Sequence, residues 1–265
     1  MNVRPRQIIH PGSRSAEFQG RCALAVMAKA PKPGHVKTRL SPPLNPQQSA
    51  ALNIAFLRDT MACLQEVAVM VDADPIISYT PAGAERDFEA IVPYDVHLVP
   101  QRGDGFGERL QHAVEDLFAA GFRAVCLIDS DSPTVPSAAY VTAVEWLLCG
   151  EDCVVLGPSE DGGYYLLGVN ASHPSLFANI AWSSAAVLEQ TLQRARAVEL
   201  PAHLLRTWFD VDDGQTLVRL FRELAEPCPA TQGFAAKHTW AYLNTIAEYL
   251  DTAPMVASVR QGEGQ

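Results

Sequence analysis

The chain has 265 residues, of which 20 are Lys or Arg and 30 are Asp or Glu, giving a formal net charge of -10. With 48% hydrophobic and 19% charged residues, it has the composition of an ordinary folded globular protein. The negative balance argues against sequence-independent nucleic-acid binding, which requires a basic surface, so any anionic ligand must be held by a local cluster of cations.

The 6 cysteines form no C-x-x-C pair, which argues against a disulfide framework and a thiolate zinc site. No apolar run approaches the roughly 18 to 20 residues of a membrane span. We therefore expect a protein without a membrane span, located in the reducing cytoplasm.

Short apolar segments bounded by turn residues predict strands, and most of them alternate with segments of helical period. The predicted strands are 22–28, 75–80, 96–101, 123–129, 153–159 and 162–169. The predicted helices start at the N-cap Asn45, near Gly107, at Ser137, at the N-cap Ser183 and after "TWFDVDD". The second of them is expected to stop at Gly121 and the last at Leu224.

This alternation predicts a mostly parallel sheet covered by helices on both faces. We expect one α/β domain over 21–224, a flexible N-terminal tail over 1–20, a helical appendage over 225–254 and a second tail over 255–265. The apolar face of the appendage is expected to pack on the domain, with a homodimer contact as the alternative.

The segment "MAKAPKPGHVKTRL", residues 27–40, places basic residues directly after the first predicted strand. Ligands of parallel α/β sheets bind at the carboxyl ends of strands. The cluster therefore predicts a phosphate site, the alternative being a solvated surface loop. It matches neither the Walker A nor the Rossmann glycine pattern. The residues expected to contribute are Lys29, Lys32, Gly34, Lys37 and Arg39.

Carboxylates follow later strands. Asp129 and Asp131 in "IDSDSPTVP" could present oxygens to Mg²⁺ or Mn²⁺, although Asp and Ser also cap turns. In "WFDVDD", Asp213 could cap the next helix, which leaves Asp210 or Asp212 as a second metal or substrate contact.

Two glycine-rich segments complete the candidate site. In "SEDGGYY", Asp161 precedes Gly162 and Gly163, which indicates either a close-packed turn aimed at the same crevice or an ordinary hairpin. In "QRGDGFGERL", Gly105 and Arg109 could close over a nucleotide, although a plain Gly-rich turn is the alternative. Taken together, the basic and acidic segments favour a site for a metal-bound nucleotide di- or triphosphate.

Five motifs in order, "KAPKPGHVKTRL", "GDGFGERL", "DSDSPTVP", "LGPSEDGGYYLLG" and "FDVDD", resemble a bacterial family of glycosyltransferase-like proteins of the GT-A superfamily, long catalogued as of unknown function. Members are often labelled nucleotide-diphospho-sugar transferases, some in connection with arsenosugar biosynthesis. The resemblance covers about 23–224. It implies a three-layer α/β/α Rossmann-like GT-A fold with a mixed, mostly parallel sheet that binds a nucleotide-sugar through a divalent metal.

The resemblance also implies roles for individual residues. Asp131 is similar to the metal-binding acid of the superfamily, and Asp129 stands where a small residue is expected. Lys29, Lys37 and Arg39 would lie near the nucleotide phosphates. Asp161, with Gly162 and Gly163, would lie on the sugar or acceptor side.

Three functions are compatible with these motifs. The first is a metal-dependent glycosyltransferase acting on a small-molecule acceptor, with Asp161 or Asp212 as the base and Lys37 and Arg39 neutralising the diphosphate. The second is a nucleotidylyltransferase that uses an NTP, since the basic loop also resembles that of the phospholactate guanylyltransferases. The third is a nucleotide-binding protein without catalysis.

Overall fold

The computed structural model of the chain describes residues 6–226 and 233–247. Within them, seven strands form one sheet in the order β3-β2-β1-β4-β6-β5-β7. Most neighbours are parallel, and only β6 runs antiparallel to its partners β4 and β5. The strands are β1 (Cys22–Lys29), β2 (Ala73–Thr80), β3 (His97–Pro100), β4 (Ala124–Ile128), β5 (Val154–Pro158), β6 (Tyr164–Val169) and β7 (Ala202–Leu204).

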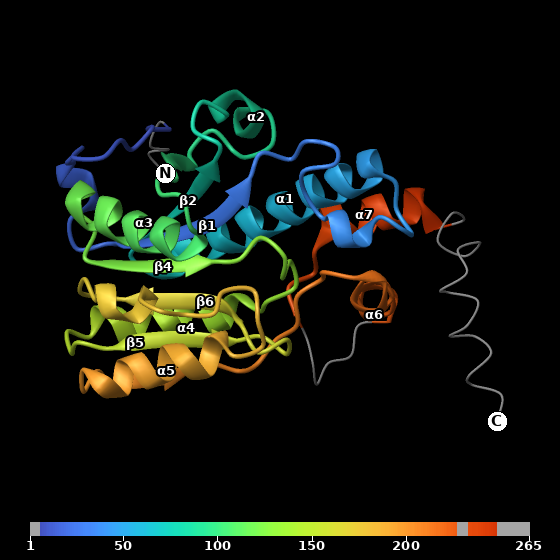
Figure 1. The fold of residues 1–265 in the computed structure, drawn as a ribbon. Coiled ribbons are helices and arrows are strands. Elements are labelled where there is room, and N and C mark those ends of the chain that lie inside the picture. Colours follow the sequence, from blue (N-terminus) through green and yellow to red (C-terminus); the bar gives the residue numbers. More distant parts are fainter. Residues whose placement is uncertain (1–5, 227–232, 248–265) are drawn as a thin grey trace.

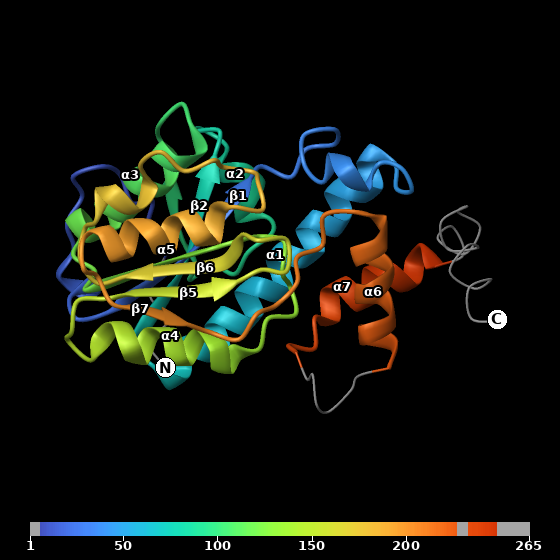
Figure 2. The same cartoon turned by 60° about the horizontal axis from the view of Figure 1, so that its bottom comes forward.

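Helices cover both faces of this sheet (Figures 1 and 2). One apolar core lies beneath α1 and α4, and a second lies beneath α3 and α5. The mixed three-layer architecture predicted from the sequence is therefore confirmed. The helices are α1 (Pro46–Met70), α2 (Glu85–Glu89), α3 (Phe106–Ala120), α4 (Ser137–Leu148), α5 (Val187–Ala197), α6 (Gly214–Ala225) and α7 (Lys237–Thr245).

Local signals set the ends of several helices. Asn45 caps α1 by accepting a hydrogen bond from the Gln48 backbone amide, with Pro46 as the first helical residue. Asp213 caps α6 in the same way. Gly121 ends α3 with a φ of 114°, in the left-handed region that glycine tolerates. These three assignments agree with the sequence prediction.

Other expectations are corrected. Ser183 does not cap α5, which begins at Val187 after an irregular loop. The short elements α2 and β7 were not predicted, because five and three residues are too few to show a period.

The N-terminal segment is not a flexible tail over 6–20. The Ile9 amide donates to the Leu98 carbonyl oxygen at 2.7 Å, and the Phe18 ring stacks on Phe122 in the core at 4.3 Å between centroids. An apolar residue in a short segment can be buried by a distant strand, which local sequence does not reveal. Residues 1–5 and the predicted tail over 255–265 lie outside the described residues.

The C-terminal helix α7 packs on α1 (Figure 2). The buried Asp59 carboxylate on α1 accepts hydrogen bonds from the backbone amides of His238 at 2.9 Å and Thr239 at 2.7 Å. These amides belong to the first turn of α7, where no intrahelical acceptor exists. Asp59 thus caps α7 from another helix. The homodimer contact stays a prediction.

Replacing Asp59 with Ala should destabilise the protein by about 2–3 kcal/mol, because two amides of α7 lose their acceptor. Urea unfolding followed by circular dichroism measures this change. The matched control is Glu66→Ala on the exposed side of the same helix, which should change stability by less than about 0.5 kcal/mol. Equal stability of the two variants would refute the capping role.

Candidate active site

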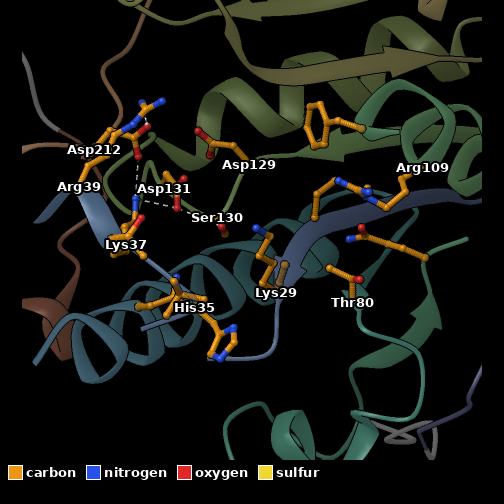
Figure 3. Close-up of a pocket in the computed structure, with 17 residues that line it drawn as sticks. Lys29, His35, Lys37, Arg39, Thr80, Arg109, Asp129, Ser130, Asp131 and Asp212 are labelled. Atoms are coloured by element: carbon orange, nitrogen blue, oxygen red, sulfur yellow. Dashed lines mark hydrogen bonds and ion pairs between the residues drawn. The ribbon is translucent and has the colours of Figure 1, made fainter. Parts of the chain in front are cut away.

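The carboxyl ends of four neighbouring strands meet at one edge of the sheet. Lys29 at the end of β1 pairs in register with Thr80 at the end of β2. Gln101 follows β3, and Asp129 follows β4. All four residues line one cavity of about 330 Å³, which we call the first lobe (Figure 3).

A second lobe of about 620 Å³ adjoins the first. Because β6 is antiparallel, its first residue lies at the same sheet edge as the last residue of β5. The loop 159–163 between them therefore reaches this lobe, and Ser159, Asp161 and Gly163 line it. The residues that line both lobes, which we call the seam, are Met27, Lys29, Arg39, Phe106, Asp129, Asp131 and Asp212.

Lys37 connects three segments that are distant in sequence. Its side chain is only 4% exposed, and Nζ lies 2.7 Å from Asp131 Oδ1 and 3.1 Å from Asp212 Oδ1. Nζ also donates to the Val211 carbonyl oxygen at 2.6 Å. An ammonium has three hydrogen-bond donors, and these acceptors account for all of them. Figure 3 shows the two ion pairs.

The loop that carries Lys37 is fixed on both sides of it by buried Val36 and Leu40. Burial lowers the pKa of Lys37, but the carboxylates of Asp131 and Asp212 outweigh that effect, so the pKa is raised from its ordinary value. Lys37 is therefore charged, and its charge is directed at the protein's own carboxylates.

Asp129 and Asp131 lie at the end of β4 in different environments. Asp129 Oδ2 accepts a hydrogen bond from Ser132 Oγ at 2.7 Å, whereas the buried Asp129 Oδ1 has no hydrogen-bond partner. Burial and the neighbouring Asp131 carboxylate raise the pKa of Asp129 well above its usual range. Asp131 forms an ion pair with Lys37 and accepts a hydrogen bond from the Ser130 hydroxyl at 3.0 Å.

Three further carboxylates line the second lobe. Asp212 Oδ2 lies 3.4 Å from Arg39, whose side chain is 72% exposed. Asp161 accepts a hydrogen bond from the Gly163 amide at 2.8 Å. Asp210 accepts one from Ser159 Oγ at 2.9 Å, and burial together with the Asp161 carboxylate raises its pKa.

The first turn of α3 contributes an aromatic and a cation. Phe106 is 44% exposed, and the guanidinium of Arg109 lies 5.8 Å from its ring centroid. Arg109 Nη1 donates to the Asp104 carbonyl oxygen, and the buried Arg109 Nε has no hydrogen-bond partner. In Figure 3, Arg109 and the Lys37 group lie on opposite sides of Lys29.

The loop 181–186, which we call the wall, lines the second lobe. It packs closely against two glycines. A Cβ at Gly162 would overlap the Ala185 backbone, and one at Gly107 would overlap the Trp182 indole nitrogen. The Leu188 amide donates to the Gly162 carbonyl oxygen at 2.9 Å. The missing side chain of Gly162 therefore makes room for the wall and not for a ligand.

The structure brings most of the predicted site residues together and leaves four outside the lining of both lobes. Lys32 is 58% exposed and pairs with Asp87 at 3.2 Å. Gly34 and Gly105 have open space around them, and Gly162 is covered by the wall. The predicted residues that line a lobe are Lys29, Lys37, Arg39, Arg109, Asp129, Asp131, Asp161, Gly163 and Asp212.

Several residues that line the lobes are not indicated by the sequence motifs. Thr80 and Gln101 are the last residues of the predicted strands 75–80 and 96–101, so the rule that ligands bind at the carboxyl ends of strands also indicates them. Trp182 lies immediately before the predicted N-cap Ser183, and nothing local in the sequence reveals its contact with α3. The others include His35, Asn53, Phe106 and Ser159.

The seam contains three aspartates that could contribute oxygen ligands to a divalent cation. Among the residues that the structure describes, no group of three or more His, Cys, Asp or Glu side chains could hold a metal by itself. Mg²⁺ is commonly bound by one or two carboxylates, with substrate phosphates and water completing its shell. Asp131 and the unpartnered Oδ1 of Asp129 fit that arrangement. The donor set therefore suits a metal that arrives with a phosphate ligand.

Comparisons with known proteins bear on the family resemblance and the fold. A family model described as "Uncharacterized protein conserved in bacteria (DUF2064)" matches residues 63–184. The family resemblance is confirmed. The chain has no significant match among curated proteins.

Solved structures also resemble the chain. A candidate nucleotide-diphospho-sugar transferase from Desulfovibrio desulfuricans G20 is 28% identical, with a TM-score of 0.74, and the match covers 88% of this chain and 97% of that one. The 4-diphosphocytidyl-2C-methyl-D-erythritol synthase of Anaerococcus prevotii DSM 20548 is 9% identical, with a TM-score of 0.51 over 80% of this chain and 100% of that one. The second likeness concerns the fold alone. The Rossmann-like, GT-A-type fold class is thereby confirmed.

Among the described helices, none combines the length and apolarity needed to cross a bilayer.

Replacing Lys37 with Met should destabilise the protein by about 2 kcal/mol, because Asp131 and Asp212 lose their shared cation while remaining partly buried. The control is Lys32→Met in the same loop, where an exposed ion pair is lost and the change should stay below about 0.5 kcal/mol. Urea unfolding of both variants without nucleotide provides the measurement. A Lys37 variant as stable as the Lys32 variant would show that Lys37 does not organise the site.

Proposed function

We propose that the protein is a metal-dependent glycosyltransferase that moves a sugar from a nucleotide-diphospho-sugar to a hydroxyl group of a small-molecule acceptor. The observation that carries this proposal is the seam. Lys29, Arg39 and three carboxylates line both lobes. A diphosphate at the seam would leave the first lobe for the nucleoside and the second for the sugar and the acceptor.

Lys29, Arg39 and Arg109 are the cations that we assign to the diphosphate. Lys29 and Arg39 are exposed at the seam, and Arg109 lines the first lobe. Lys37 was expected to bind phosphate directly, but its three donors are already bonded to protein oxygens. Its proposed role is therefore to position Asp131 and Asp212.

In the proposed reaction, the acceptor oxygen attacks the anomeric carbon of the sugar. The bond between that carbon and the diphosphate oxygen breaks, and the nucleoside diphosphate leaves with the electron pair. The acceptor proton passes to a carboxylate, for which Asp161 is the candidate because both oxygens of Asp212 lie near cations. Cations placed in advance would stabilise the charge that develops on the leaving group.

Mg²⁺ or Mn²⁺ held by Asp131 and Asp129, when bound, would supply further positive charge to the leaving phosphates. The buried and unpartnered oxygen of Asp129 supports this assignment. The similarity to the candidate nucleotide-diphospho-sugar transferase of Desulfovibrio desulfuricans supports a transferase acting on nucleotide-sugars.

The alternative is a nucleotidylyltransferase. In that reaction a phosphorylated small molecule attacks the α-phosphorus of an NTP, and pyrophosphate leaves. The same cations and carboxylates would serve it, so the leaving group separates the two functions. A protein that binds nucleotide without turnover is the remaining alternative.

A stability panel tests the choice of donor. UDP-, GDP- and dTDP-sugars are compared with free NTPs, with and without Mn²⁺, by thermal unfolding. A ligand at 100 times its dissociation constant adds about 2.7 kcal/mol of stability, so one nucleotide-sugar should raise the melting temperature in the presence of metal. Preference for NTPs with release of pyrophosphate would establish the alternative.

Asp131→Asn should abolish the metal-dependent part of that stabilisation, because the substitution removes a charged oxygen ligand at the seam. Asp87→Asn is the control, since Asp87 pairs with Lys32 outside the cleft. A metal response in Asp131→Asn equal to that of the unaltered protein would contradict the metal assignment.

Lys29→Ala should weaken binding of the preferred nucleotide-sugar by about 10- to 100-fold, the effect of losing a charged hydrogen bond of about 1.5–3 kcal/mol. Titration calorimetry measures this change. Lys32→Ala, which removes an equal charge from the same loop outside the cleft, should leave the affinity within about twofold. If Lys32→Ala weakens binding as much as Lys29→Ala, general charge rather than the seam holds the nucleotide.

A further inference from the structure

The two lobes differ in charge. The first lobe has cations of its own, Lys37 and Arg109, besides those at the seam. The charged side chains that line only the second lobe are Asp161 and Asp210, and both are acidic. Apart from Lys29 and Arg39 at the seam, no described Lys or Arg lines the second lobe. An anionic group placed deep in this lobe would therefore face carboxylates without a compensating cation.

The polar groups of the second lobe can bind hydroxyl groups. A carboxylate only accepts hydrogen bonds, so Asp161 and Asp210 would require a donor such as a hydroxyl or an ammonium. Ser183 in the wall can both donate and accept, whereas the Ser184 hydroxyl already donates to the Ala181 carbonyl oxygen at 2.6 Å. A ligand rich in hydroxyl groups could satisfy this mixture, whereas a phosphate or a carboxylate, which lacks donors when ionised, could not.

The wall also supplies an aromatic surface. Trp182 is half-buried, lines the second lobe and packs edge-to-face against Phe106, with ring centroids 5.4 Å apart and planes at 83°. Gly107 lets the indole lie directly against α3. The Ala181 amide beside it donates to Gln190 Oε1 at 2.7 Å, which anchors the loop. The ring is thus held in place by its surroundings, so binding a ligand against it would cost little side-chain entropy.

We propose that the second lobe selects an acceptor that bears several hydroxyl groups and is uncharged or positively charged, and that Trp182 determines this specificity by packing against the carbon face of the acceptor. The inference rests on the proposed function, because it assigns the second lobe to an acceptor. It extends that function by naming the acceptor's chemical class and a residue that the motifs did not indicate.

The same charge pattern bears on the alternative function. A nucleotidylyltransferase must bind a second substrate that carries a phosphate, and that phosphate must reach the seam from the second lobe. Its only cations there would be Lys29 and Arg39, which the nucleotide phosphates already require. The second lobe therefore suits a sugar and an uncharged acceptor better than a second phosphate ester.

The test uses the full chain with Mg²⁺ and the nucleoside diphosphate identified by the stability panel, and also without them. Three matched probes are titrated by ligand-observed NMR: methyl glucoside, glucosamine and glucose 6-phosphate. Methyl glucoside and glucosamine should bind, and glucose 6-phosphate should bind at least tenfold more weakly when the nucleotide fills the first lobe.

Trp182→Ala should weaken methyl glucoside binding about tenfold, and Trp182→Phe should restore most of it, because Phe retains an aromatic ring that can pack against the carbon face of the probe. Trp146→Ala is the control, since Trp146 packs on His203 and lines neither lobe. Asp161→Lys should shift the preference towards glucose 6-phosphate. Thermal unfolding of each variant verifies that it is folded.

Three results would overturn the inference: binding of none of the probes, tighter binding of glucose 6-phosphate than of methyl glucoside, or equal affinities in Trp182→Ala and Trp146→Ala. Failure of the proposed function is separate, because it appears in the stability panel as the absence of a metal-dependent response to any nucleotide-sugar. A protein that responds to nucleotide-sugars but prefers glucose 6-phosphate would retain the function and refute the acceptor class.

Discussion

The buried ammonium of Lys37 is the interaction on which the arrangement of the cleft depends. It joins the basic loop after β1 to Asp131 after β4 and to the segment 211–212 before α6. Without it, three carboxylates, those of Asp129, Asp131 and Asp212, would face one cavity with no buried cation among them. A charge that is rigidly bonded on all sides costs no reorganisation when a ligand binds. The exposed cations around it remain free to contact that ligand.

The sheet topology explains why the cleft has two chemically different lobes. Parallel strands β1, β2 and β3 lead to the basic loop, Thr80 and Gln101, which line the first lobe, and β4 leads to Asp129 and Asp131 at the seam. The antiparallel β6 places the loop 159–163 at the same edge and brings carboxylates to the other side. Gly162 and Gly107 then admit the wall and its aromatic ring. A single edge of one sheet therefore presents a cationic surface and an acidic, partly aromatic one side by side.

Much of the fold follows from local sequence. The caps Asn45 and Asp213 and the terminator Gly121 act through hydrogen bonds and dihedral angles within a few residues, so pattern reasoning finds them. The rule that ligands bind after strands found Lys29 and Asp129 for the same reason. The same rule could not distinguish the buried Lys37 from the exposed Lys32, because tertiary structure decides which distant carboxylates lie beside each lysine. Trp182 and the packing of residues 6–20 are likewise products of tertiary contact.

The Lys37–Asp212 pair links residues that are 175 positions apart. Contacts of such separation form slowly, since a long stretch of chain must be ordered before they are gained. During synthesis, all strands from β1 to β6 are complete by Val169, but two of the three acceptors of Lys37 lie beyond residue 210. A nascent chain would therefore possess most of its sheet while Lys37 still lacked those acceptors. The cleft can therefore be completed only after residues 211 and 212 have been synthesised, so a ligand of the cleft would bind only when most of the chain has been made.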